Sequence, residues 1–260
     1  MDDGGFQMSP GKIITVGSGK GGTGKTTTAA AVSSCLAAMG YKTLCIDFDA
    51  GMKDLDLSLG MPDFTVTDFT DVLTGHLSLA EAVNENPRIP GLFFLSAPAL
   101  AGPGELDSAA VYKMFEEIEA EFDYCLVDSP AGVGIGFSLA HCKADMALIV
   151  ATGDLPAMRD AQQAAIMARE SGVCDIRLLV NRVLPRNLKQ FRITIDDVID
   201  TIGVQLIGMV REDKYIPYSL HENTPLILYR KRRSAFDYLD TARRITGEDV
   251  PLRMNAINIL

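Results

Sequence analysis

Residues 19–27 read Gly19-Lys20-Gly21-Gly22-Thr23-Gly24-Lys25-Thr26-Thr27 and match the phosphate-binding pattern G-x-x-x-x-G-K-[ST]. An apolar run over 13–16 comes just before this stretch and predicts a buried strand, and an alanine-rich run over 28–39 follows it and predicts a helix. A glycine-rich turn without a ligand is the alternative, but it does not account for eight residues in register between a strand and a helix. We therefore expect this stretch to bind the phosphates of a nucleotide.

Each residue type in this phosphate loop has a chemical reason to be there. The four glycines let successive backbone N–H groups turn toward phosphate oxygens. The helix that starts within the loop adds free N–H groups and the positive end of its dipole. Lys25 is expected to reach the β- and γ-phosphates, and the hydroxyl of Thr26 to take a position at Mg²⁺.

Composition favours one α/β domain over residues 1–260, with a flexible N-terminus at 1–10 and a tail at 247–260. The net charge of −10 argues against attraction to nucleic acid or to anionic lipid by bulk charge. Residues 1–10 lack the apolar core of a signal peptide, and no apolar run approaches the ~20 residues that span a membrane. We expect a cytoplasmic protein.

Cysteine usage agrees with a reducing compartment. No C-x-x-C pair occurs, so the spacing supports neither a zinc site nor an iron–sulfur site. Most of the five cysteines lie in apolar runs, which predicts buried free thiols. They are Cys35, Cys45, Cys125, Cys142 and Cys174.

Apolar strand-like runs alternate with helical patterns along the rest of the chain. The predicted strands are 43–46, 92–95, 124–127, 146–151, 177–180 and 205–210, and the predicted helices are 67–73, 79–83, 109–120, 157–169, 195–202 and 234–245. The strands are continuously apolar, which is typical of strands covered by helices on both faces. The expected fold is therefore a three-layer, doubly wound, mostly parallel sheet.

Polar residues stand where several of these strands end, which is the edge where such sheets bind ligands. Asp47 and Asp49 follow one strand and Asp128 ends another, so the three carboxylates can hold Mg²⁺ or orient an attacking water. Caps of the following loops are the alternative role for these acids. Gly132 offers an N–H to a γ-phosphate, and Asn181 either contacts an adenine edge or caps a turn or helix.

Several motifs resemble the MinD family of ATPases. Lys20 makes the loop similar to the deviant Walker A motif shared by MinD, ParA, arsenite-pump ATPases and the nitrogenase iron protein. Residues 47–57 resemble switch I, and residues 127–132 resemble switch II in the S-P-A-G form typical of MinD. Weaker similarities cover 154–161, the adenine-contacting strand end 180–182, which includes Arg182, and 198–213.

The resemblance implies an ATPase that cycles between an ADP monomer and an ATP dimer to position the division site or another structure. Lys20 would touch the phosphates of the partner, Asp49 would orient water, and Asp47 with Asp128 would support Mg²⁺. A division inhibitor or topological regulator would act on it. Open alternatives are a ParA-like partitioning ATPase that binds DNA, a regulator of flagellar number, an iron–sulfur scaffold or reductase, and a kinase or synthase.

The sequence departs from the family at sites that bear on partners. Lys53 and Asp54 replace the family's Arg and Asn in switch I, and Arg211 replaces a Pro beside the expected adenine contact. The tail 247–260 holds one basic residue, two acids and a proline, so we expect weak or absent membrane contact. The basic cluster 230–233 precedes a helix and is expected on a solvated face.

Overall fold

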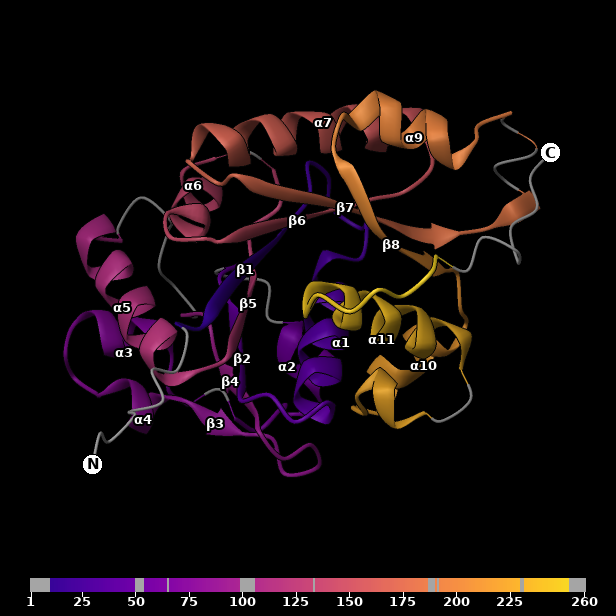
Figure 1. Cartoon of the computed structure of the whole chain (residues 1–260). Helices are drawn as coiled ribbons and strands as arrows, with labels where there is room; N and C mark the ends of the chain where they lie inside the picture. The colour runs from indigo at the N-terminus through magenta and orange to yellow at the C-terminus, as the bar shows by residue number, and fades with distance from the viewer. Residues whose placement is uncertain are drawn as a thin grey trace, which may run out of the picture.

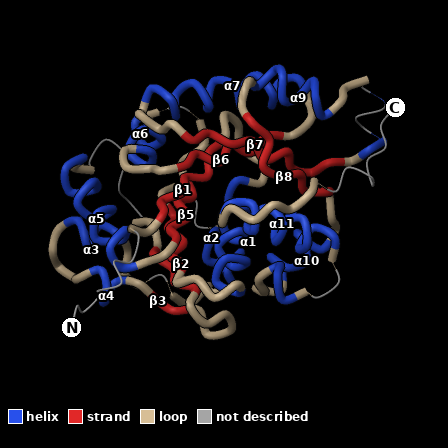
Figure 2. Tube along the Cα trace, in the orientation of Figure 1, coloured by secondary structure: helices blue, strands red, loops and turns tan. Residues whose placement is uncertain are grey.

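An eight-stranded sheet forms the middle layer of the molecule, in the order β3-β4-β2-β5-β1-β6-β7-β8 (Figures 1 and 2). All neighbouring strands are parallel except β3 and β4. The strands are β1 Lys12–Gly17, β2 Thr43–Asp47, β3 Asn84–Glu85, β4 Leu92–Leu95, β5 Tyr124–Asp128, β6 Met146–Ala151, β7 Asp175–Val183 and β8 Gln205–Arg211. This arrangement confirms the predicted doubly wound, mostly parallel sheet.

The structure is a computed structural model that describes residues 10–49, 54–64, 66–98, 106–132, 134–186, 190, 192–229 and 232–252. Within these ranges the helices are α1 Lys25–Ala38, α2 Leu55–Leu59, α3 Phe69–Leu73, α4 Leu79–Ala82, α5 Ser108–Glu121, α6 Ile135–His141, α7 Leu155–Glu170, α9 Ile195–Ile202, α10 Tyr215–His221 and α11 Arg233–Ile245, with a 3-10 turn η1 at Leu226–Leu228. The predictions for Lys53, most of switch I before Asp54, and the tail beyond Leu252 fall outside the described residues.

Helices cover both faces of the sheet (Figure 1). Helices α1, α2 and α11 pack on one face, where α1 presents Ala29, Val32 and Leu36 to the buried side chains of Ile14 and Val16 of β1. Helices α3, α4 and α5 cover the other face at one end of the sheet, and α7 and α9 cover it at the opposite end. Burial of β1 on both sides explains its continuous apolar sequence.

Strand order reverses on either side of β1, because the chain places β5 and β2 on one side of it and β6 on the other. In sheets of this kind a crevice opens at such a reversal, at the carboxyl ends of the strands. The predicted phosphate loop follows β1 directly. The topology therefore positions that loop at the crevice.

All the predicted strands and helices are present, with differences of a few residues at their ends. Among the elements named above, α2, α6, α10, the 3-10 turn η1 and strand β3 were not predicted. Each has at most seven residues, which is too short to display a clear period. Strand β7 does not end at Asn181 as predicted but continues to Val183.

Two surface predictions need correction. Cys35, Cys45 and Cys125 are buried free thiols as expected, but Cys142 is half-buried and Cys174 is exposed near the start of β7. Of the basic cluster, Arg230 and Lys231 lie outside the described residues, and Arg233 is exposed as expected. Arg232 is instead half-buried, with its guanidinium carbon 3.3 Å from the ring centroid of Tyr215. Among the residues that the structure describes, no helix combines the length and apolar character needed to cross a bilayer.

Candidate nucleotide-binding site

The phosphate loop has the backbone geometry that its glycines predict. Gly22 and Gly24 adopt φ of 79° and 91°, a left-handed conformation that glycine takes without strain. Gly24 is also the N-cap of α1, so the free N–H groups of the first helical turn face the same crevice as the loop. These features fit a binding site for anionic phosphates.

Close contacts with Asp160 and Asn181 leave no room for a side chain at Gly19 and Gly24 of the loop. A Cβ atom on Gly19 would lie 2.0 Å from the carbonyl oxygen of Asp160 on α7. A Cβ atom on Gly24 would lie 2.2 Å from Nδ2 of Asn181. The glycines at these two positions are therefore required by close approach and not only by backbone turning.

Buried charges meet at the helix side of the loop. Nζ of Lys25 lies 3.0 Å from Oδ1 of Asp128 and 3.8 Å from Oδ2 of Asp49. The parallel register of β2 and β5 sets Asp47 beside Asp128. The hydroxyl of Thr26 lies beside Asp128 and opposes the rise in the pKa of that carboxyl. The structure thus brings the predicted metal and catalytic residues Thr26, Lys25, Asp47, Asp49 and Asp128 together.

Three carboxylates surround one lysine in this cluster, and the pKa values of all three are raised. Burial, and after it the carboxylate of Asp128, raises the pKa of Asp47 to about 8. Burial also raises the pKa of Asp49 and of Asp128, and in both cases the Lys25 ammonium opposes the shift. A divalent cation bound here would offset this excess of buried negative charge.

The donor atoms at this site suit Mg²⁺ bound together with phosphate and water better than a metal ion bound by protein side chains alone. The described residues contain no group of three or more His, Cys, Asp or Glu side chains that could hold a metal ion. Mg²⁺ is commonly bound through one or two carboxylates, water and substrate phosphates. Thr26, Asp47 and Asp128 fit that pattern, since they offer a hydroxyl and two carboxylates beside the phosphate loop.

Switch II contacts both the loop and Asp49. The backbone N–H of Gly132 donates to the carbonyl of Ser18 at 3.3 Å, and the backbone of Ala131 lies beside Asp49, where it opposes the rise in the pKa of that carboxyl. Gly132 has φ of 89°, which places it in the left-handed region. The predicted γ-phosphate sensor therefore lies against the loop, with its N–H bonded to protein in this structure.

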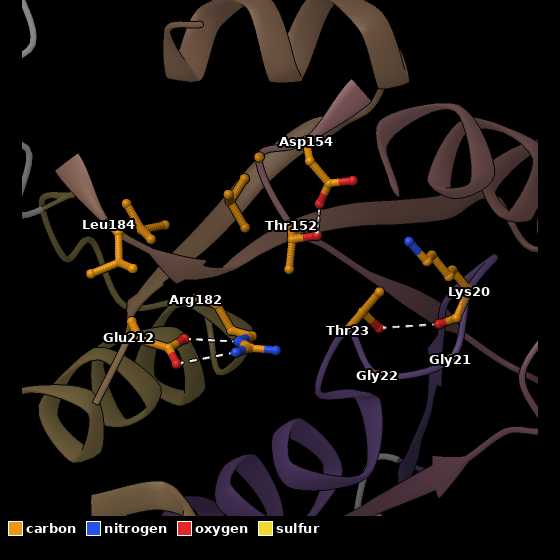
Figure 3. A pocket seen from close by; sticks show the side chains of 12 residues that line it. Lys20, Gly21, Gly22, Thr23, Thr152, Asp154, Arg182, Leu184 and Glu212 are labelled. Atoms are coloured by element: carbon orange, nitrogen blue, oxygen red, sulfur yellow. Dashed lines mark hydrogen bonds and ion pairs between the residues drawn. The ribbon is translucent and has the colours of Figure 1, made fainter. Parts of the chain in front are cut away.

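Strands β7 and β8 border the side of the site where the nucleotide base is expected, hereafter the base side. Nδ2 of Asn181 donates to the carbonyl of Thr23 at 2.8 Å, and its Oδ1 accepts from the N–H of Arg182 at 2.9 Å. Nε of Arg182 lies 2.8 Å from Oε2 of Glu212, and its Nη2 lies 3.2 Å from Oε1 (Figure 3). Asn181 was predicted to contact adenine or to cap a turn; in this structure it holds the phosphate loop.

Two neighbouring cavities flank the loop. One, of about 300 Å³, has Lys20, Thr152 and Asp154 in its wall, with Lys20 across the cavity from the Arg182–Glu212 pair (Figure 3). The other, of about 310 Å³, has Thr27, Asn181 and the loop after β8 in its wall. Arg182, Glu212 and Gly22 border both cavities.

The Arg211 departure has a structural explanation. The backbone N–H of Arg211 donates to Oδ2 of Asp237 at 3.1 Å, and its guanidinium forms an ion pair with the same carboxylate on α11. Proline has no N–H and no charge, so it could make neither contact. Nearby, Ser234 donates to Asp213 at 2.8 Å. Helix α11 thus supports the loop that borders the base side.

Sequence reasoning missed several of these residues. Thr152 follows the strand 146–151 directly, so the strand-end rule that found Asp128 also applies to it. Glu212 lies inside the family-like stretch 198–213 but had no assigned role. Asp237 and Tyr238, whose hydroxyl lies 3.4 Å from that of Thr28, carried no sequence signal because they lie on a remote helix.

Comparison with known proteins places this geometry in a family. A family model described as an AAA domain matches residues 11–168. Septum site-determining protein MinD of Synechocystis is 35% identical over 243 residues, which cover 92% of this chain and 91% of that protein.

Two solved structures extend the similarity to three dimensions. The MinC:MinD cell division protein complex of Aquifex aeolicus matches with a TM-score of 0.87 and 33% identity, over 93% of this chain and 98% of that chain. MinD of Pyrococcus horikoshii complexed with Mg-ADP matches with a TM-score of 0.78 and 25% identity, over 92% and 99%. The chain therefore belongs to the MinD family of septum site-determining proteins.

Proposed function

We propose that this protein is a MinD-like ATPase that cycles between an ADP-bound monomer and an ATP-bound dimer to place the division site. Membership of the MinD family supports ATPase activity and a role in division-site placement. It favours this role over ParA-like partitioning. The observation that carries the mechanism is the position of Lys25, held between Asp128 and Asp49 at the start of α1.

Residues 19–27 would bind the phosphates of ATP or ADP. Lys25 would exchange its contact with Asp128 for one with the β- and γ-phosphates, and Thr26, Asp47 and Asp128 would hold Mg²⁺. Bound Mg²⁺ supplies positive charge that neutralises the phosphates. The solved complex of the Pyrococcus horikoshii relative with Mg-ADP supports a nucleotide and Mg²⁺ as the ligands.

Asp49 is the carboxylate best situated to orient an attacking water. Its side chain is 26% exposed, whereas Asp47 and Asp128 are nearly inaccessible. It also lies beside both Lys25 and switch II. A water on Asp49 would therefore be next to the γ-phosphate and next to the segment that responds to its loss.

Lys20 is proposed to act across the dimer. It is exposed at the rim of the loop, and it forms no ion pair with any described residue. Lys25 already serves the phosphates of its own chain. A second lysine exposed at the rim would meet the phosphates of a facing protomer, so ATP would act as the counterion between two chains.

A protein effector and a place in the cell complete the proposal. The Aquifex aeolicus relative was solved in complex with MinC, which supports a protein effector. We propose that such an effector is a division inhibitor or topological regulator and that a protein partner stimulates hydrolysis. We place the protein in the cytoplasm, with at most peripheral contact with the inner face of the membrane. The low basic content of the tail is the reason to expect that contact to be weak.

The dimer mechanism can be tested by light scattering of Asp49→Ala, a background in which hydrolysis is slowed. This variant should dimerise in Mg-ATP and not in Mg-ADP. Adding Lys20→Ala should abolish ATP-dependent dimerisation while much of the nucleotide affinity remains, whereas adding Lys113→Ala, an exposed lysine on α5, should change nothing. A Lys20→Ala double variant that dimerises as well as Asp49→Ala would contradict the cross-dimer role of Lys20.

A further inference from the structure

Asn181 and Arg182 occupy a β-bulge near the end of β7. Val180 pairs with Met209 of β8 and Val183 pairs with Arg211, so the two residues between them on β7 face one residue on β8. Arg182 has φ of 55°, a left-handed conformation that is uncommon outside glycine. Bulges of this kind redirect side chains and occur often beside functional sites.

The two bulge residues, Asn181 and Arg182, make contacts in different directions. Asn181 is buried and bonds to the phosphate loop through the carbonyl of Thr23. Arg182 reaches outward and makes a two-pronged ion pair with Glu212 (Figure 3). The backbone N–H of Glu212 donates to the carbonyl of Val183, which fixes the carboxylate opposite the bulge. The pair therefore joins the ends of β7 and β8 across the base side of the site.

The surface position of the Arg182–Glu212 pair indicates that this ion pair can open and close. Its side chains are 54% and 34% exposed, so the pair stands at the surface. Both residues border both cavities beside the phosphate loop. An exposed ion pair is weak and breaks easily, unlike the buried pair of Arg211 and Asp237 close by.

We propose that the Arg182–Glu212 pair is a latch over the base side of the nucleotide pocket, and that its opening limits both the entry and the release of nucleotide. The inference rests on the proposed function, because it takes the cavity beside Thr27 and Asn181 as the place of the base. A nucleotide whose phosphates lie in the loop would extend its base under the latch. The latch would form with the pocket empty or full, so it controls exchange rates and leaves affinity nearly unchanged.

Stopped-flow fluorescence with mant-ADP and Mg²⁺ tests the latch through Glu212→Gln, which removes the charge and keeps the shape. Association and dissociation rate constants should both rise by about three- to fivefold, with the dissociation constant changed by less than about twofold. Raising salt from about 50 mM to about 500 mM should speed exchange in the wild type and not in Glu212→Gln. Glu222→Gln, an exposed acid at the end of α10, is the matched control and should behave as the wild type does.

A charge swap separates a latch from general damage to the pocket. Arg182→Glu combined with Glu212→Arg should restore slow exchange relative to either single variant. Faster dissociation of Glu212→Gln with unchanged association would overturn the proposal, because it would make Glu212 part of the wall that holds bound nucleotide. Unchanged rates would overturn it as well. A wild type that does not bind mant-ADP would overturn the proposed function and the latch with it.

Discussion

The phosphate side and the base side of the pocket are built in opposite ways. The phosphate side uses one contiguous loop and carboxylates from the neighbouring strands β2 and β5, and the charges of Lys25, Asp47 and Asp128 are buried there. The base side joins a bulge in β7, the loop after β8 and helix α11, and its Arg182–Glu212 pair is partly exposed. The first side is shaped for strong electrostatic contact, and the second for adjustable contact.

The phosphate side keeps the sequence motif of the family, whereas the base side contains a residue that departs from it. The departure at Arg211 lies on the base side and is compensated there by Asp237, a residue 26 positions away. The phosphate loop matches the motif without departure. We therefore expect substitutions on the phosphate side to abolish binding, and those on the base side to alter stability and exchange.

The largest effect is expected from Lys25→Ala. This change removes the cation that the phosphates need and leaves Asp128 buried without its nearest positive partner. Affinity for Mg-ADP in isothermal titration calorimetry should fall by roughly 100-fold or more, equivalent to about 3 kcal/mol. Lys113→Ala is the control. If Lys25→Ala bound Mg-ADP within about fivefold of the wild type, phosphate binding would not depend on the buried charge of Lys25.

The sequence predicted the two sides unequally, for physical reasons. The loop, Asp47, Asp49 and Asp128 could be found because a local motif and the ends of apolar strands mark them. Asn181 was located by the same rule, but its hydrogen bond to the phosphate loop depends on the bulge.

Register and long-range pairing explain most of what was missed. A bulge depends on how two strands align, and the strand pattern of either one alone does not contain that alignment. Glu212 lies 30 residues from Arg182, and Asp237 lies on a helix that only tertiary packing brings to β8. Sequence spacing therefore predicts neither the exposed Arg182–Glu212 pair nor the buried Arg211–Asp237 pair.

A smaller effect is expected when the support of the base side is removed. Asp237→Asn leaves the guanidinium of Arg211 without its partner, and Arg211→Pro, the residue typical of the family, leaves the buried Asp237 carboxylate without one. Each should lower the free energy of unfolding by about 2 kcal/mol, measured by urea denaturation. Glu248→Gln breaks the ion pair between Glu248, which follows α11, and Arg243 of that helix. Both side chains are more than two-fifths exposed, so this change should cost less than about 0.5 kcal/mol. Equal losses in Asp237→Asn and Glu248→Gln would contradict a special role for the Arg211 pair.

The smallest effect concerns His141, which lies beneath the phosphate side. Its ring stacks on Phe137, Nδ1 is bonded to the carbonyl of that residue at 2.7 Å, and Nε2 is buried without a hydrogen-bond partner among the described residues. A Cβ atom on Gly17, at the end of β1, would lie 3.0 Å from the Phe137 ring and 3.6 Å from the His141 ring. Packing below the loop thus includes a neutral imidazole that a proton would disrupt.

Burial lowers the pKa of His141 from 6.5 to about 4 in the folded protein. The unfolded chain therefore binds more protons between these two values, so this contribution to stability is complete above pH 6.5 and is lost as pH falls toward 4. Urea denaturation at pH 7.5 and 5.5 should show that the wild type loses about 1 kcal/mol more than His141→Gln over this interval. The same comparison with His221→Gln, which removes an exposed imidazole, is the control. Parallel losses in the wild type and His141→Gln would mean that acid weakens this side through other groups, and the buried carboxylates around Lys25 would be the next to replace.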